Sequence, residues 1–197
     1  MRFFEEIKLA VLERLEKGLP PELHYHSVGH TKDVQEQAER IALAENVHSK
    51  EEIYLLKIAC IFHDTGFLFT YKEHEERGYR IAEETLPAFG IGPKELEIIR
   101  GLIMATRIPQ SPQNRLEEII CDADLDYLGR DDFFSISQKL FNELQVLNMV
   151  KSEDQWNQIQ VKFFRQHSYF TRTNKELRTA KKNEHLKIIE ATIINTE

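Results

Sequence analysis

The segment that most constrains the fold of this chain is an apolar run at residues 53–62 that ends in His63 and Asp64. The letters SKEE at residues 49–52 precede it, and a hydroxyl followed three residues later by a carboxylate is typical of a helix N-terminus. The predicted helix is apolar on nearly every side, which indicates a central helix packed all round. An imidazole and a carboxylate are costly at the end of such a helix unless they are paired or bind a metal.

The rest of the chain shows amphipathic helical spacing, without sustained strand alternation or internal repeats. We therefore predict an all-α, single-domain bundle of about eight to nine helices over residues 1–197, with a metal-site core at about 24–130 and a C-terminal helical extension at about 131–197. The expected helices cover about residues 3–15, a segment ending near 46, 49–64, 72–88, 95–106, 116–127, 131–149, 153–167 and 174–194.

Composition narrows the functional classes. Hydrophobic residues at 41% and charged residues at 30% are typical of a soluble globular protein, and a net charge of −7 argues against general nucleic-acid binding. No apolar segment is long enough to span a membrane, and the N-terminus turns acidic too early for a signal peptide. Cys60 and Cys121 lie inside apolar runs, so we expect buried free thiols and a cytoplasmic protein.

Three polar residues upstream of the central helix have helical spacing. His26, His30 and Asp33 stand at i, i+4 and i+7, so they are expected to share one face of a helix. That face continues into an apolar stripe that begins at Val34. Two histidines would then point toward the protein interior.

Downstream, the segment at residues 121–126 offers three carboxylates, and helical phase separates them. Asp124 stands four residues after Ile120 and three before Tyr127, so it is expected on the apolar stripe. Asp122 and Asp126 fall on the opposite side and are expected to be solvated. Asp124 is therefore the inward candidate.

Two imidazoles and two carboxylates, from His30, His63, Asp64 and Asp124, make a mixed nitrogen and oxygen ligand set suited to a catalytic divalent metal. The expected ion is Mn, Co, Ni, Mg, Fe or Zn, with one ion per chain. Asp64 and His26 are the candidate catalytic residues, because Asp64 would hold the ion that activates water and His26 could protonate a leaving oxygen. The reaction expected from such a site is hydrolysis.

This pattern resembles the HD-domain metal-dependent phosphohydrolases. The resemblance rests on His30, the pair His63-Asp64 and Asp124, and it covers about residues 24–130. It implies an all-helical phosphomonoesterase or phosphodiesterase that hydrolyses a nucleotide or another small phosphorylated metabolite.

The segment YHSVGHTKDV at residues 25–34 is also similar to the signature of cyclic-nucleotide phosphodiesterases, which have tyrosine, histidine and asparagine before the ligand histidine. That similarity implies that His26 is the proton donor. Ser27 stands in place of the asparagine, and the chain is too short for a complete catalytic domain of that kind. We interpret the similarity as common ancestry of the metal site only.

Four further residues are candidates for substrate contacts. His74 stands at about the distance where binuclear HD proteins place a further histidine, but the stretch comparable to their later histidine pair reads MATR at residues 104–107. We therefore prefer one metal and assign His74 to the substrate or the metal-bound water. Lys32, Arg77 and Arg107 are candidates to bind a phosphoryl oxygen.

Two alternatives remain open at the level of sequence. The first is a catalytically silent HD module that binds a nucleotide or a partner protein, and the second is oxygenase chemistry at an iron pair, which needs more ligands than the pattern supplies. A homodimer is also left open. Arg178, Lys181 and Lys182 are expected on an exposed face of the last helix.

Overall fold

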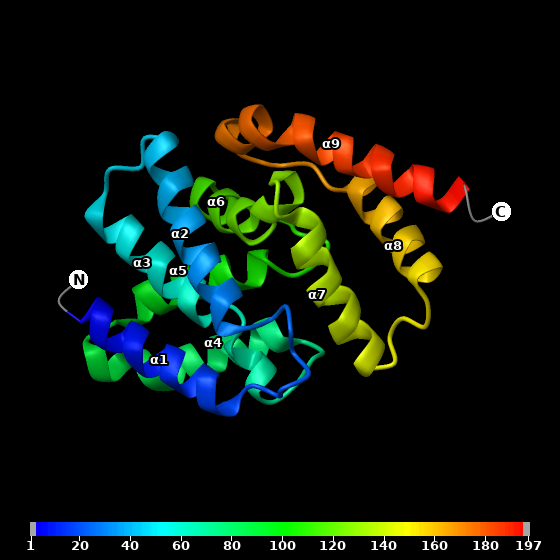
Figure 1. Cartoon of the computed structure of the whole chain (residues 1–197). Coiled ribbons are helices and arrows are strands. Elements are labelled where there is room, and N and C mark those ends of the chain that lie inside the picture. Colours follow the sequence, from blue (N-terminus) through cyan, green and yellow to red (C-terminus); the bar gives the residue numbers. More distant parts are fainter. Residues whose placement is uncertain (1–2, 195–197) are drawn as a thin grey trace.

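The computed structural model describes residues 3–194, and within that span the chain forms nine α-helices, three short 3₁₀ helices and no β-strand (Figure 1). The all-α prediction is confirmed. The α-helices are α1 (Phe4–Gly18), α2 (Val28–Ala44), α3 (Lys50–Phe62), α4 (His74–Thr85), α5 (Pro93–Ala105), α6 (Arg115–Asp124), α7 (Phe133–Val146), α8 (Glu153–Gln166) and α9 (Arg172–Ile194). The 3₁₀ helices are η1 (Thr65–Leu68), η2 (Leu86–Phe89) and η3 (Asp126–Gly129).

Helix α3 is the centre of the main core, as its all-round apolar pattern predicts. It packs against α1, α2 and α5, and from Tyr54 to Phe62 every residue except Lys57 is buried. Burying a large apolar side chain contributes about 1.5–3 kcal/mol, so this one helix accounts for a large part of the stability of the core. Ser49 caps it by accepting a hydrogen bond from the amide of Glu52, where the sequence predicted the helix to begin.

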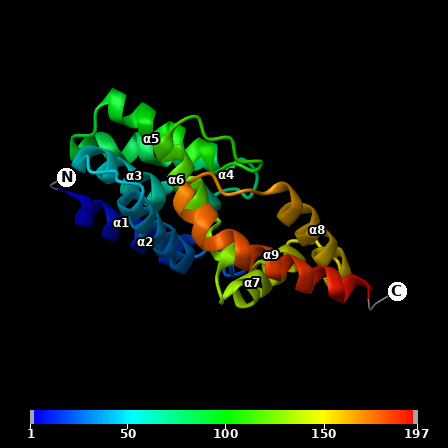
Figure 2. The same cartoon turned by 90° about the horizontal axis from the view of Figure 1, so that it is seen from above.

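Helices α7, α8 and α9 form a second layer that covers one end of the molecule (Figures 1 and 2). A smaller apolar cluster lies between them and η3. Helix α9 approaches η3 so closely that a Cβ atom on Gly129 would lie 2.4 Å from the carbonyl oxygen of Arg178. The C-terminal layer is thereby held against η3, which directly follows α6. The candidate site lies at that end of α6.

The expectation that Asp122 and Asp126 are solvated is wrong, because both side chains are fully buried. Hydrogen bonds and salt bridges from the C-terminal part of the chain compensate for their burial. Asp122 accepts hydrogen bonds from the amides of Phe170 and Thr171 at 2.8 Å. Asp126 accepts two from the guanidinium of Arg178 at 2.9 Å. Their position in the helical repeat does turn both residues away from the main core. That side is covered instead by the chain before α9 and by α9 itself.

The same packing corrects the expectation for the basic residues of α9. Lys182 is only 4% exposed, and its ammonium group donates to the carbonyl oxygens of Phe164 and His167. Arg178 is partly buried against Asp126, while Lys181 remains on the surface beside Asp131.

Both cysteines are buried free thiols, as predicted, and burial raises the pKa values of Cys60 and Cys121. Among the described helices, none is long and apolar enough to cross a membrane.

Candidate metal centre and cavity

The start of α2 determines where His26 and His30 lie. The Ser27 side chain accepts from the amide of His30, so the helix begins at Val28 and His30 lies in its first turn. His26 therefore precedes the helix, which corrects the expectation that it shares a helical face with His30 and Asp33. The chain before the cap folds back instead, and the two imidazole rings lie 6.1 Å apart between centroids.

The end of α3 places the second pair. Helix α3 ends at Phe62, His63 is its C-cap, and Asp64 precedes the tight turn of η1. Gly66 in that turn has no room for a side chain, because a Cβ atom there would lie 1.9 Å from the carbonyl oxygen of His74. The start of α4 therefore packs directly on η1, and Nε2 of His74 lies 3.6 Å from Oδ1 of Asp64.

Asp124, the last residue of α6, completes the cluster. Its Oδ1 lies 3.0 Å from Nε2 of His30 and 3.7 Å from Nε2 of His63. Oδ2 of Asp64 lies 3.5 Å and 3.2 Å from the same two nitrogens. The structure thus brings together all four residues that the sequence nominated as ligands, from three separate helices.

The donor atoms of this cluster fit a divalent metal. Protein nitrogen and oxygen ligands lie about 2.0–2.2 Å from an ion such as zinc, so two of them on one ion are separated by about 3–4 Å, as here. Ligand atoms of His30, His63 and Asp124 all lie within 4.8 Å of one another. Asp64 lies outside that set of three but contacts both histidines.

Two atoms of the cluster point to a missing partner. Nε2 of His63 and Oδ2 of Asp64 are buried and form no hydrogen bond with any described residue, although they lie 3.2 Å from each other. Nδ1 of His63 donates to the carbonyl oxygen of Cys60 at 2.7 Å, so Nε2 is the ring nitrogen that faces the two carboxylates. A buried polar atom without a partner is costly, and a metal ion would satisfy both atoms.

The charges agree with this assignment. Burial opposes the ionisation of Asp64, yet the neighbouring histidines hold its pKa well below the usual range. Burial likewise opposes the ionisation of Asp124, and hydrogen bonds from His30 and His63 lower its pKa to about 2. Both groups are carboxylates at neutral pH, so their two negative charges match one divalent cation.

Glu143 of α7 holds His26, and sequence analysis did not single it out. Its carboxylate is fully buried and accepts hydrogen bonds from Nδ1 of His26 and from the His26 amide at 3.1 Å. The Tyr25 amide and the Tyr71 hydroxyl donate to it as well. Nδ1 of His26 is therefore held by Glu143, and His26 lines the same cavity as Asp64.

A signal for Glu143 was present in the sequence. Ile136, Leu140 and Glu143 stand at i, i+4 and i+7 on α7, so the glutamate lies in phase with apolar residues. A carboxylate on the inward face of a helix needs a partner, as it does for Asp124.

The residues nominated for substrate contacts lie at different distances from the cluster. His74 lines the same cavity as Asp64 and Asp124. Arg107 lies nearby, with its Nε 3.5 Å from a carboxylate oxygen of Glu75, which also lines the cavity. Lys32 and Arg77 are not among the lining residues that the structure describes, and the Arg77 guanidinium lies over the Phe69 ring.

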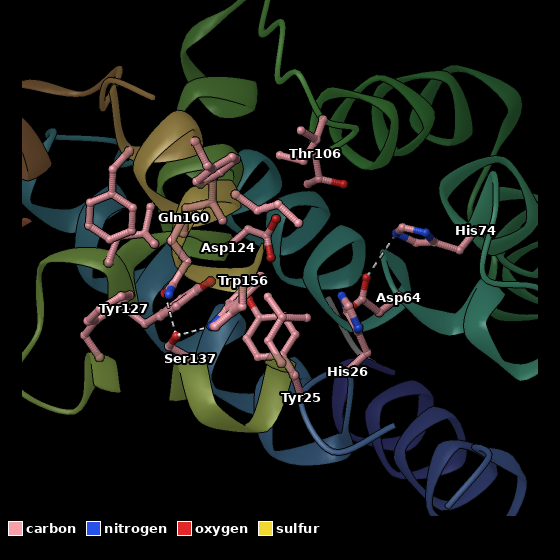
Figure 3. A pocket seen from close by; sticks show the side chains of 18 of the residues that line it. Tyr25, His26, Asp64, His74, Thr106, Asp124, Tyr127, Ser137, Trp156 and Gln160 are labelled. Carbon is pink, nitrogen blue, oxygen red and sulfur yellow. Dashed lines mark hydrogen bonds and ion pairs between the residues drawn. The ribbon is translucent and has the colours of Figure 1, made fainter. Parts of the chain in front are cut away.

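The cavity has a volume of about 230 Å³ and extends from the metal cluster toward α7 and α8 (Figure 3). In Figure 3, His26, Asp64 and His74 lie at one end, Asp124 lies between the two ends, and Ser137, Trp156 and Gln160 lie toward the other. The His26 ring stacks on Phe67 with centroids 4.1 Å apart, which fixes its orientation at the edge of the cavity. His26 and two of the four candidate metal ligands, Asp64 and Asp124, thus line one cavity.

The helical bundle and the His-Asp cluster together define an all-α protein with a mixed nitrogen and oxygen site for a divalent metal. The chain belongs to the HD domain family, whose model matches residues 27–126, about half of the sequence. That match contains all four candidate ligands.

A solved structure has the same fold. It is described as a predicted HD superfamily hydrolase from an uncultured Thermotogales bacterium, and it is 20% identical to this chain. The similarity covers 99% of this chain and 94% of the other, with a TM-score of 0.63. No protein of curated function matches the sequence.

Proposed function

We propose that this protein is a metal-dependent phosphohydrolase that cleaves a phosphoester of a small metabolite. The observation that carries the proposal is the buried contact between Nε2 of His63 and Oδ2 of Asp64, which lie 3.2 Å apart and form no hydrogen bond with any described residue, beside a cavity that Asp64 and His26 line. Membership of the HD family and the fold of a predicted HD hydrolase support it.

Each group at the site has a role in this reaction. His30, His63, Asp64 and Asp124 would hold the ion, and Asp64 is also in contact with His74. When bound, a divalent ion lowers the pKa of coordinated water toward neutrality and draws negative charge from a phosphoryl oxygen. His26 donates a proton to the leaving oxygen, and Glu143 keeps its ring oriented.

The shape of the site supports a small substrate. A cavity of about 230 Å³ has room for a phosphoryl group with a compact substituent. The sequence-based expectation of a nucleotide or another small phosphorylated metabolite agrees with this size. One phosphoryl group beside one ion also agrees with the preferred count of one metal per chain.

The test is an activity assay on the full chain, loaded in turn with manganese, cobalt, nickel, magnesium, iron or zinc. We expect hydrolysis of at least one member of a panel of phosphomonoesters and phosphodiesters, and a loss of at least 100-fold in Asp64→Asn. Asp154→Asn, an exposed aspartate in the first turn of α8, is the control. The absence of turnover with every loaded metal, or unchanged turnover in Asp64→Asn, would overturn the proposal.

A further inference from the structure

The end of the cavity away from the metal cluster is an apolar chamber between η3, α7 and α8 (Figure 3). Its wall consists of large hydrophobic side chains, mostly buried. These residues are Leu128, Phe133, Leu140, Trp156, Phe163 and Phe164. A chamber of this kind favours apolar groups in proportion to the area they remove from water.

The polar groups along the chamber are occupied with one another. Trp156 donates through Nε1 to Oγ of Ser137 at 3.3 Å, and Oγ of Ser137 donates to Oε1 of Gln160 at 2.6 Å. Gln160 in turn donates to Oδ1 of Asn157 at 3.2 Å. Closer to the metal cluster, the hydroxyl of Thr106 donates to a backbone carbonyl.

This arrangement bears on substrate choice. A site that selects a nucleobase presents free donors and acceptors to the edge of the base, and such groups reject analogues that leave them unpaired. Here the side chains with polar atoms mainly pair with each other, and the wall beside them is hydrocarbon and aromatic.

Charge points the same way. None of the cavity-lining residues within the described span is a lysine or an arginine, whereas Asp64, Glu75 and Asp124 are carboxylates. A single phosphoryl group needs only one contact with a divalent ion held by the His-Asp cluster. A polyphosphate chain or a second phosphate would meet negative side chains without a lining cation to balance them.

We propose that the substrate is a phosphate ester of an apolar alcohol, with the phosphoryl group at the metal cluster and an aryl ring or short hydrocarbon chain in the chamber. This proposal rests on the proposed function and names its substrate class. The size agrees, because a cavity of about 150 Å³ holds one benzene molecule, and the whole cavity here measures about 230 Å³.

The proposal is tested with the metal-loaded full chain and a graded series of substrates. The series is methyl, butyl, hexyl and phenyl phosphate, with adenosine 5′-monophosphate and adenosine 5′-triphosphate for comparison. We expect kcat/KM to rise at least 10-fold from methyl to hexyl phosphate, since each buried methylene is worth about a factor of four. Phenyl phosphate should be preferred over both nucleotides.

Ile159 supplies a variant that keeps the fold. It lines the cavity and is 41% exposed, so Ile159→Glu places a charge at the chamber without disrupting the buried core. The ratio of kcat/KM for hexyl over methyl phosphate should fall at least fivefold. Ile188→Glu, on the exposed face of α9, makes the same chemical change away from the cavity and should leave the ratio unaltered.

Binding is measured separately, so that failure of this proposal is distinguished from failure of the hydrolase assignment. Hexylphosphonate and phenylphosphonate should bind the metal-loaded protein at least 10-fold more tightly than methylphosphonate in calorimetry. If they do so without any turnover, the chamber assignment stands and the hydrolase assignment fails. If turnover occurs but nucleotides are preferred, or if neither rate nor affinity rises with apolar size, the chamber assignment is overturned.

Discussion

The carboxylate of Glu143 accepts a hydrogen bond from Nδ1 of His26, across 117 residues of sequence. It also accepts the backbone N–H of His26, so both the ring and the main chain of the proposed acid are fixed by α7. Although burial opposes ionisation of Glu143, its contacts with His26 lower the pKa of that carboxyl below its usual value. The negative charge of Glu143 therefore persists at neutral pH beside the ring.

Glu143→Gln should reduce kcat about 10- to 100-fold, the usual cost of losing a group that orients a functional histidine. The loss should be larger for phenyl phosphate than for 4-nitrophenyl phosphate, because a good leaving group needs little help from an acid. Metal content, measured by elemental analysis, should stay unchanged. Glu16→Gln, an exposed glutamate on α1, is the matched control, and equal losses with both esters would contradict the role of Glu143.

The metal site predicts a stoichiometry and a stability change. We expect one ion per chain in the wild type and in His74→Ala, and less than a tenth of that amount in His63→Ala. Saturation at 100 times the dissociation constant stabilises a folded protein by about 2.7 kcal/mol, so the ion should raise Tm in the wild type and not in His63→Ala. Elemental analysis measures the number of ions per chain, and thermal melts with and without a chelator measure the change in Tm. Two ions per wild-type chain would contradict the predicted stoichiometry.

Asp126 should be a stability residue. It is fully buried and accepts hydrogen bonds from Arg40 at 2.8 Å, Asn174 at 3.0 Å and Arg178 at 2.9 Å. Asp126→Ala leaves buried positive charge without its partner, which typically costs about 3–5 kcal/mol in the free energy of unfolding. Asp131→Asn removes an exposed ion pair with Lys181 and should cost far less, because solvent screens such a pair. Urea titrations measure both, and similar losses would refute the assignment.

His167 should make stability depend on pH. Burial and the nearby Lys182 lower its folded-state pKa to about 3, from an ordinary value of 6.5. Between these values the unfolded chain binds the proton and the folded protein does not, so this contribution is complete above pH 6.5 and is lost as pH falls toward 3. The slope is at most about 1.4 kcal/mol per pH unit.

The corresponding measurement compares unfolding free energies at pH 7 and pH 5. His167→Gln should lose less stability than the wild type over this interval, because it removes the titrating group. A steeper loss in His167→Gln, or an NMR titration of His167 with its midpoint near pH 6.5, would show that the ring is not held neutral.

Much of the site was predictable because the chemistry of its residues conflicts with their position in apolar patterns. His63 and Asp64 end an apolar helix, and Asp124 falls on an apolar stripe, so each required a partner. The helix starting after Ser49 was predictable because capping depends on residues three apart. These signals are local, and local signals survive without knowledge of tertiary contacts.

The expectations that failed depend on distant parts of the chain. His26 leaves the helical face of His30 because Ser27 caps α2, and Glu143 then holds its ring from α7. Asp122 and Asp126 are buried because the segment before α9 and α9 itself cover a face that looked free from the main core. The sequence of a single helix does not indicate which other helices will pack against its outer face.

The separation between the metal ligands and the chamber wall has an evolutionary consequence. The ligands come from the first and second halves of the family match, while the wall comes mainly from α7 and α8, beyond residue 126. Substitutions at the wall positions of those two helices, away from Glu143, can change the shape of the chamber and leave the four candidate ligands in place. Relatives with the same His-Asp cluster can therefore differ in substrate specificity. The residues to compare between them are those of α7 and α8 that line the chamber.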